Sequence, residues 1–220
     1  KVSAFTSAKV DQILALKPDL AIGFSDIQAD IAAELVRRGV EVWISNHRSV
    51  AGILDYVRRL GAMVGAAAKA EAYADSLERG VDAVAAKAAQ FPVRPRVYFE
   101  DWDEPRISGI QWVAELVRIA GGDDIFPELA AESLAKHRIL ASDDAILRRD
   151  PQIVFGSWCG KKFPPGTVAA RPGWGGVSAV RDGQLFEIKS PIILQPGPAA
   201  LTDGLAEMHA HITRWVAARA

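Results

Sequence analysis

The sequence predicts an α/β protein of two lobes with mainly parallel sheets, bridged by a single long helix. Three observations lead to this fold class: short apolar runs alternate with amphipathic segments, one alanine-rich stretch is unusually long, and one local pattern occurs on both sides of that stretch. The predicted division is an N-terminal lobe at 1–65, a bridging helix at 66–91 and a C-terminal lobe at 92–220.

The first lobe follows from βαβ logic, in which parallel strands are joined by helical crossovers. Apolar residues at helical spacing alternate there with compact apolar runs that suit buried parallel strands. Only two strands are evident, fewer than an open sheet normally has, so we expect this lobe to be truncated at its N-terminal side. The predicted helices are 8–16, 27–38 and 49–63, and the predicted strands are 19–24 and 40–45.

The bridging helix is predicted at 66–91, where alanine and scattered charges give high helix propensity and Gly80 is the only breaker. About 25 residues at 1.5 Å each would span roughly 37 Å, which is too long for a routine crossover. Pro92 and Pro95 then end the helix.

Alternation resumes in the second lobe. Asp182-Gly183 is a turn dipeptide, and the segment around it predicts a hairpin or a pair of short strands. The predicted strands are 96–101 and 152–156, the predicted hairpin is 178–188, and the predicted helices are 110–120, 143–149 and 198–217.

One unit is repeated in the two lobes. Asp11–Gly23 reads DQILALKPDLAIG, and Asp144–Gly156 reads DAILRRDPQIVFG. Asp, Ile, Leu, Pro and Gly coincide at a constant offset, so each lobe is expected to contain a short helix, a proline stop and a strand that ends in glycine.

Composition excludes several classes of function. The 220 residues have a formal net charge of −1, which gives no electrostatic sign of nucleic-acid binding. Cys159 is the single cysteine, so a disulfide framework and a multi-cysteine metal site are excluded. No hydrolase elbow, phosphate loop or dinucleotide fingerprint occurs, and we assign no catalytic residue and no metal site. An enzyme would have to use Cys159 with His47 or Asp103.

Candidate ligand contacts follow the predicted strands, because ligands of open α/β sheets lie beyond the carboxyl ends of the strands. Aromatic side chains stand at three of four such ends, where they could pack on a large flat conjugated ring while polar groups meet its fringe. The alternative is that they line the interface between the lobes. The candidates are Phe24, Trp102, Arg106, Arg138 and Trp158.

Several stretches resemble one family in their order and spacing over nearly the whole chain. They are similar to the ABC-importer substrate-binding proteins that carry cobalamin, haem and ferric siderophores, and most of all to the cobalamin-binding members. The stretches are FTSAKVDQILALKPDLAIGF, LVRRGVEVWIS, PRVYFEDW, ELVRIAGGDDIF and LRRDPQIVFGSW.

This resemblance implies a monomeric periplasmic protein, or one anchored on the outer face of the cell membrane. It implies two lobes with the ligand in the cleft between them, no enzymatic activity and no cofactor. The expected ligand is cobalamin or another corrinoid, and the alternative is a ferric siderophore or haem. The expected partner is an ABC-importer membrane permease, with no nucleic acid. A two-lobed enzyme or sensor that uses Cys159 remains the alternative from another class.

The resemblance also gives roles to particular residues. Phe24 matches a position where an aromatic side chain contacts ligand, and Asp11 and Asp144 match the carboxylates that dock on permease arginines. The family more often has Glu at the docking positions. Asp144 could instead serve only to cap its helix, since Ser142 to Ala145 is by itself a good helix start.

Overall fold

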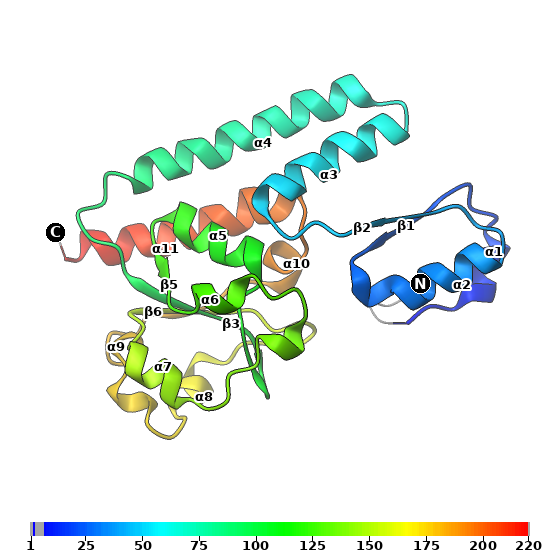
Figure 1. Ribbon diagram of the computed structural model, residues 1–220. Helices are drawn as coiled ribbons and strands as arrows, with labels where there is room; N and C mark the ends of the chain where they lie inside the picture. The colour runs from blue at the N-terminus through cyan, green and yellow to red at the C-terminus, as the bar shows by residue number, and fades with distance from the viewer. Residues whose placement is uncertain (1, 3–6, 220) are drawn as a thin grey trace. The chain divides into compact units, whose positions relative to one another are not determined.

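A computed structural model describes residue 2 and residues 7–219. The chain divides into two compact units, residues 1–47 and 48–220, which are described separately (Figure 1). Helix α3 (Val50–Met63) was expected in the first lobe, but its contacts assign it to the second unit.

The first unit is a small βαβ element. Strands β1 and β2 run parallel and pair in register from Ala21 with Val42 to Phe24 with Ser45. Gly23 lies against Ile44 and Gln28, because a Cβ there would stand 2.4 Å from the Ile44 Cδ1. The elements are α1 (Val10–Ala15), β1 (Ala21–Phe24), the 3₁₀ turn η1 (Asp26–Gln28), α2 (Ala29–Arg37) and β2 (Val42–Ser45).

The second unit holds the remaining elements. Its longer helices are α3 (Val50–Met63), α4 (Ala67–Ala88), α5 (Gln111–Ala120) and α11 (Leu205–Ala217), which continues a π-helical turn η4 (Ala200–Gly204). Its strands are β3 (Arg96–Asp103), β4 (Arg106–Ser108), β5 (Asp123–Asp124), β6 (Ile153–Gly156) and β7 (Leu185–Glu187). Its short helices are α6 (Pro127–Ala130), η2 (Ala135–His137), α7 (Asp144–Arg149), α8 (Pro165–Ala169), η3 (Trp174–Gly176), α9 (Ser178–Arg181) and α10 (Ser190–Ile193).

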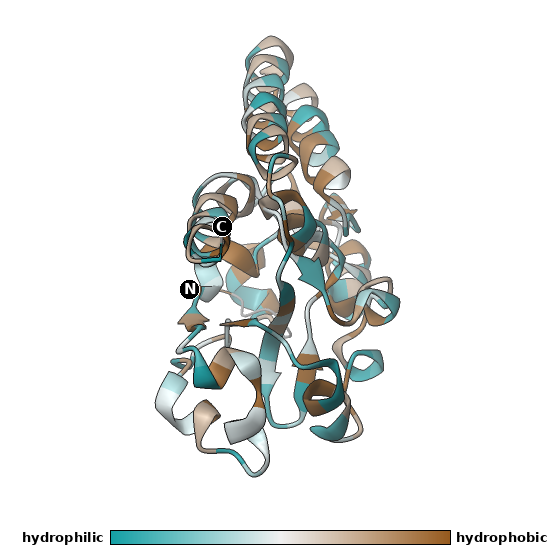
Figure 2. Ribbon diagram, turned by 90° about the vertical axis from the view of Figure 1, so that its left-hand side faces the viewer, coloured by the Kyte–Doolittle hydropathy of each residue, from teal (hydrophilic) through white to brown (hydrophobic). Residues whose placement is uncertain are grey.

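The long helix is confirmed as one continuous element of 22 residues, which at 1.5 Å each gives about 33 Å. It ends at Ala88, three residues earlier than expected, and Gly80 does not interrupt it. Helix α3 lies alongside α4, where Arg58 of α3 pairs with three carboxylates of α4 at 2.8–3.3 Å. Hydrophobic and hydrophilic residues alternate along both helices, as expected for a partly exposed helix pair (Figure 2).

The sheet of the second unit has the order β4-β3-β6-β7, with β5 also beside β3. Strands β3, β5, β6 and β7 are parallel, and β4 returns antiparallel to β3. The carboxyl ends of β3, β6 and β7 therefore meet at one edge of the sheet, which we call the carboxyl edge.

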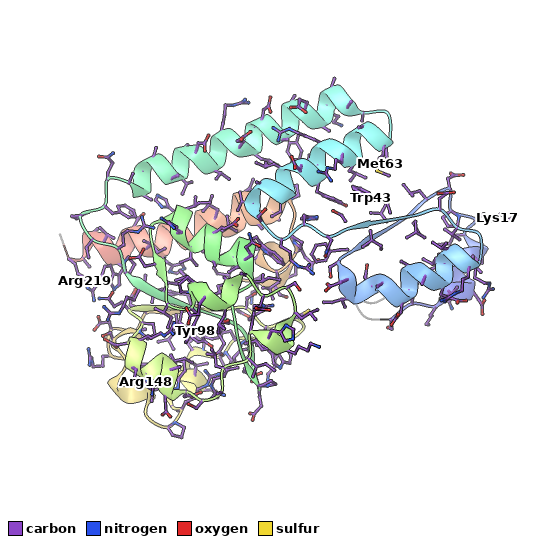
Figure 3. The ribbon with its side chains drawn as sticks, viewed as in Figure 1. Lys17, Trp43, Met63, Tyr98, Arg148 and Arg219 are labelled. Carbon is purple, nitrogen blue, oxygen red and sulfur yellow. The ribbon has the colours of Figure 1, made fainter. Side chains whose placement is uncertain are left out.

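Helices cover both faces of this sheet (Figure 1). Helices α5 and α11 pack on one face, against Val97, Phe99 and Phe155, which are at most 1% exposed. Helices α7, α8 and α9 lie on the other, where Tyr98 and Val154 join a buried cluster (Figures 1 and 3). This alternation is what a strand buried on both faces requires, and it confirms the α/β class.

The hairpin predicted at 178–188 is wrong. Ser178–Arg181 is the short helix α9, whose start is held by the Asp150 carboxylate, which accepts hydrogen bonds from the Ser178 N–H (2.7 Å) and hydroxyl (2.8 Å). Only Leu185–Glu187 is a strand, and it pairs parallel with β6. The Asp182-Gly183 turn thus links a helix to a strand.

Replacing Gly156 with alanine is expected to lower the free energy of unfolding by about 1–3 kcal/mol. Gly156 ends β6, and a Cβ there would stand 1.7 Å from the Phe163 ring, which is itself buried. Chemical denaturation would measure the loss. The control is Gly166→Ala in α8, where a Cβ meets no atom within 4 Å. Equal stability of the two variants would contradict this packing argument.

Candidate functional site

The carboxyl edge of the second sheet brings together the predicted contacts of that lobe. Trp102 lies near the end of β3, Arg106 begins β4, and Trp158 lies just beyond β6. The Trp102 indole N–H donates to the Glu104 carbonyl at 2.9 Å, which fixes the ring over the turn between β3 and β4. Trp102 is therefore held at the turn between two paired strands.

Lys161, which the sequence did not single out, is central to this edge. Its Nζ lies 5.4 Å from the ring centroid of Trp102 and 4.9 Å from that of Trp158. The same Nζ is 2.6 Å from the Asp103 Oδ2. Both ring contacts are within the range of cation–π attraction, so one ammonium ties the β3–β4 turn to the segment after β6. We call Trp102, Asp103, Trp158 and Lys161 the indole–lysine cluster.

Trp158 is almost wholly buried, with 3% of its surface exposed. It packs edge-on against Phe163 with ring centroids 5.2 Å apart. Its indole N–H has no hydrogen-bond partner among the described residues. Trp102 is only partly buried. Trp102 is thus more accessible than Trp158, and ligand contact by either residue stays a prediction.

Arg106 and Arg138 are both engaged within the protein. The Arg106 Nε is 2.5 Å from the Asp143 Oδ1, and its Nη1 donates to the Asp103 carbonyl at 3.0 Å. Arg138 is 3% exposed, and its Nη1 donates to the Asp101 carboxylate at 3.0 Å and to the Ser108 carbonyl. Burial raises the pKa of Asp101, and the Arg138 charge opposes that rise.

A second unpredicted pair lies deeper in the same strand. Glu100 is fully buried, and the Arg171 guanidinium donates to both of its oxygens, at 2.7 and 2.8 Å. Burial lowers the pKa of Arg171, but the bonds to Glu100 outweigh that effect and the net direction is upward. Burial has the opposite effect on the Tyr98 hydroxyl, whose pKa it raises well above its ordinary value. The acidic run at the end of β3, Glu100-Asp101-Trp102-Asp103, was the sequence signal for these pairs.

In the first unit, Phe24 stands at the end of β1, as predicted. Its ring meets the His47 ring edge-on, with centroids 5.1 Å apart. The His47 Nδ1 is 2.7 Å from the Ser45 hydroxyl, and the Phe24 N–H donates to the Gln28 side chain at 2.8 Å. Phe24 is partly buried, and its contact with ligand stays a prediction.

The two predicted docking carboxylates occupy equivalent places in the two units. Each lies in the first turn of a short helix, Asp11 in α1 and Asp144 in α7, and each is exposed. Asp11 pairs with Arg38 at 3.1 Å, and Asp144 accepts from the Ser142 hydroxyl at 3.1 Å. In neither helix does the N-cap residue supply a side-chain cap.

A groove of about 830 Å³ lies elsewhere in the second unit, beside α5, β5 and α6. It contains Asp124, whose pKa burial raises to about 6. None of the predicted contact residues lines it. Among the described residues, no group of three or more His, Cys, Asp or Glu side chains could hold a metal ion. No helix within those residues is both long and apolar enough to cross a membrane.

Two units, each with parallel strands and helices, make this an α/β protein of two lobes. The sequence model described as periplasmic binding protein matches residues 1–192, and the chain belongs to this family.

Two curated relatives are vitamin B12-binding proteins. One, from Vibrio vulnificus, is 23% identical over 218 residues, 91% of this chain and 71% of the relative. The other, from Vibrio parahaemolyticus, is 24% identical over 160 residues, 71% of this chain and 56% of the relative. The chain thus spans little more than half the length of the second relative in that match.

Solved structures show the same fold at low identity. A periplasmic vitamin B12-binding protein of Vibrio cholerae is 22% identical, with a TM-score of 0.73 over 97% of this chain and 81% of that one. A periplasmic haem-binding protein from Roseiflexus is 19% identical, with a TM-score of 0.79 over 96% and 83%. An ABC-transporter substrate-binding protein from Listeria monocytogenes is 17% identical, with a TM-score of 0.79 over 96% and 83%.

Proposed function

We propose that this protein is the substrate-binding component of an ABC importer and that it captures a corrinoid, with cobalamin as the favoured ligand. The observation that carries the proposal is the indole–lysine cluster at the carboxyl edge of the second sheet. A partly exposed indole held over ordered backbone suits a large flat ring. The names of the two curated relatives support the same ligand class.

The proposed role is transport rather than catalysis. The protein would act as a monomer in the periplasm or on the outer face of the cell membrane, deliver its ligand to a membrane permease, and need no cofactor of its own. Membership of the periplasmic binding protein family supports this location and this role.

The second candidate is a ferric siderophore or haem as ligand. It is favoured by the fold shared with the haem-binding protein from Roseiflexus. Titration with cyanocobalamin and with haemin, followed by calorimetry and by the absorbance bands of each ring, separates the two. A stoichiometric shift of the corrin bands supports the main proposal, and a shift of the haem band alone supports the second.

Replacing Trp102 with alanine is expected to weaken cyanocobalamin binding about tenfold, equivalent to about 1.4 kcal/mol, because a ring face is lost from the ligand surface. Isothermal titration measures the change. The control is Tyr73→Ala, which removes an exposed aromatic side chain from α4, away from the carboxyl edge. Equal affinity of the two variants would remove Trp102 from the site.

A further inference from the structure

Four basic side chains at the carboxyl edge share one property: each is already paired with a carboxylate of the protein. The pairs come from different parts of the chain, yet three of the four carboxylates belong to the end of β3. They are Arg106 with Asp143 at 2.5 Å, Lys161 with Asp103 at 2.6 Å, Arg171 with Glu100 at 2.7 Å and Arg138 with Asp101 at 3.0 Å.

These pairs are shielded from water to different degrees. The Glu100 side chain is fully buried, and those of Asp103 and Asp143 are 19% and 23% exposed. Removing one partner of a shielded pair leaves an uncompensated charge, which is strongly unfavourable. A ligand carboxylate that recruited one of these cations would therefore have to displace a protein carboxylate that stays nearby.

Asp103 is the member of this set whose lysine, Lys161, also contacts both indoles. Its Oδ2 pairs with Lys161, while its Oδ1 is buried and has no hydrogen-bond partner among the described residues. Negative charge at this position is thus only partly compensated, and it would repel a second anion brought to the same lysine.

Two other lysines of this edge act on the Glu187 carboxylate of β7. Lys189 pairs with the Glu187 carboxylate, and Lys162 lies close enough to the same carboxylate to lower its pKa further. Lys189 follows β7, and Lys162 directly follows Lys161 in the chain.

We propose that this edge selects ring ligands with a neutral, amide-bearing fringe over ligands with several carboxylates, and that Asp103 sets this selectivity. The proposal rests on the function proposed above and names the substrate class of the same site. An amide can exchange hydrogen bonds at the edge without competing for the paired cations. A polycarboxylate ligand would need positions beside these cations, and carboxylates of the protein already occupy those positions.

The test uses two probes that share one ring. Dicyanocobinamide carries side-chain amides, and dicyanocobyrinic acid carries carboxylates in their place. The wild-type protein is expected to bind the amide probe at least about tenfold more tightly. Asp103→Asn leaves Lys161 free to pair with a ligand carboxylate, so the affinity for the acid probe relative to that for the amide probe should rise about tenfold.

Two further variants serve as controls. Asp123→Asn breaks a similar pair, with Arg94 at 3.0 Å, at the opposite end of β3, and should leave the selectivity unchanged. Adding Lys161→Met to Asp103→Asn should abolish the gain for the acid probe. Melting temperatures of all variants exclude unfolding as the cause of a lost signal.

The outcomes separate the two proposals. If dicyanocobinamide, cyanocobalamin and haemin all fail to bind, the proposed function is wrong, and the selectivity with it. If a probe binds but the wild type does not discriminate between amide and acid rings, or Asp103→Asn leaves their ratio unchanged, the selectivity proposal is overturned and the transport role stands.

Discussion

Reversing the charge of both Asp11 and Asp144 to arginine is expected to abolish ligand delivery to the permease while leaving ligand affinity within about twofold. Both carboxylates are exposed and lie in the first turns of α1 and α7, one in each unit. Charge-assisted pairing with arginine gives orientation as well as attraction, so two reversed charges would turn two attractions into repulsions. Uptake by cells that depend on this protein, and ATP hydrolysis by the importer in proteoliposomes, measure the loss.

The matched control has to carry the same change of net charge. Asp82 of α4 and Asp203 of the π-helical turn are also exposed carboxylates, and reversing both gives a variant of identical charge. If delivery falls equally in the two double variants, net charge rather than docking is responsible. If delivery survives the reversal of Asp11 and Asp144, the docking assignment is wrong.

The single reversals carry information of their own. The Asp11 side chain is 91% exposed but pairs with Arg38, and an exposed pair of this kind contributes little to stability. Both single variants should therefore fold normally and reduce delivery only in part, because the other unit keeps its carboxylate. Complete loss with one reversal alone would show that the two positions are not equivalent.

The repeated unit explains why so much of the fold could be predicted. Both copies form a short helix followed by a strand, α1 with β1 and α7 with β6, and both strands end at or next to the repeated glycine. Local signals determine such units: a proline stop, an apolar run and a glycine against which another side chain packs. The segment 178–188 lacked a comparable signal, because only the distant Asp150 decides that its first half is helical.

The location of the candidate site could be predicted from the sequence, but the pairing of its charged side chains could not. Residues that follow strands had to meet at one edge, and Trp102, Arg106 and Trp158 do so. The ion pairs at this edge join residues 37 to 71 positions apart along the chain, a separation that no local pattern encodes. Arginines that look available for ligand in the sequence are therefore engaged by carboxylates in the fold.

Burial was the other property that the sequence could not supply. Trp102 lies near the end of β3 and Trp158 just beyond β6, but Trp158 packs against Phe163 and Lys161 and is buried. The fold thus gives two tryptophans at one edge different roles, one partly exposed and one supporting.

Replacing Glu100 with alanine is expected to lower the free energy of unfolding of the second unit by about 3–5 kcal/mol. The Arg171 side chain is 10% exposed and donates two hydrogen bonds to this carboxylate, so its charge would be left buried without a partner. Arg171 also lies 4.9 Å from the Trp174 ring, and that ring is fully buried and its indole N–H donates to Asp143 at 2.7 Å. The damage should therefore reach Asp143, the carboxylate that pairs with Arg106 at the carboxyl edge.

Urea denaturation measures this loss, with an unchanged slope to confirm that the native and unfolded states keep their compactness. Glu128→Ala is the control, because its pair with Arg149 is exposed and should contribute less than about 1 kcal/mol. The double variant Glu100→Leu with Arg171→Met removes both charges and should recover most of the stability, since an apolar pair of similar volume needs no compensation. If the double variant is as unstable as Glu100→Ala, packing rather than the unpaired guanidinium is the cause, and the carboxyl edge does not depend on this ion pair.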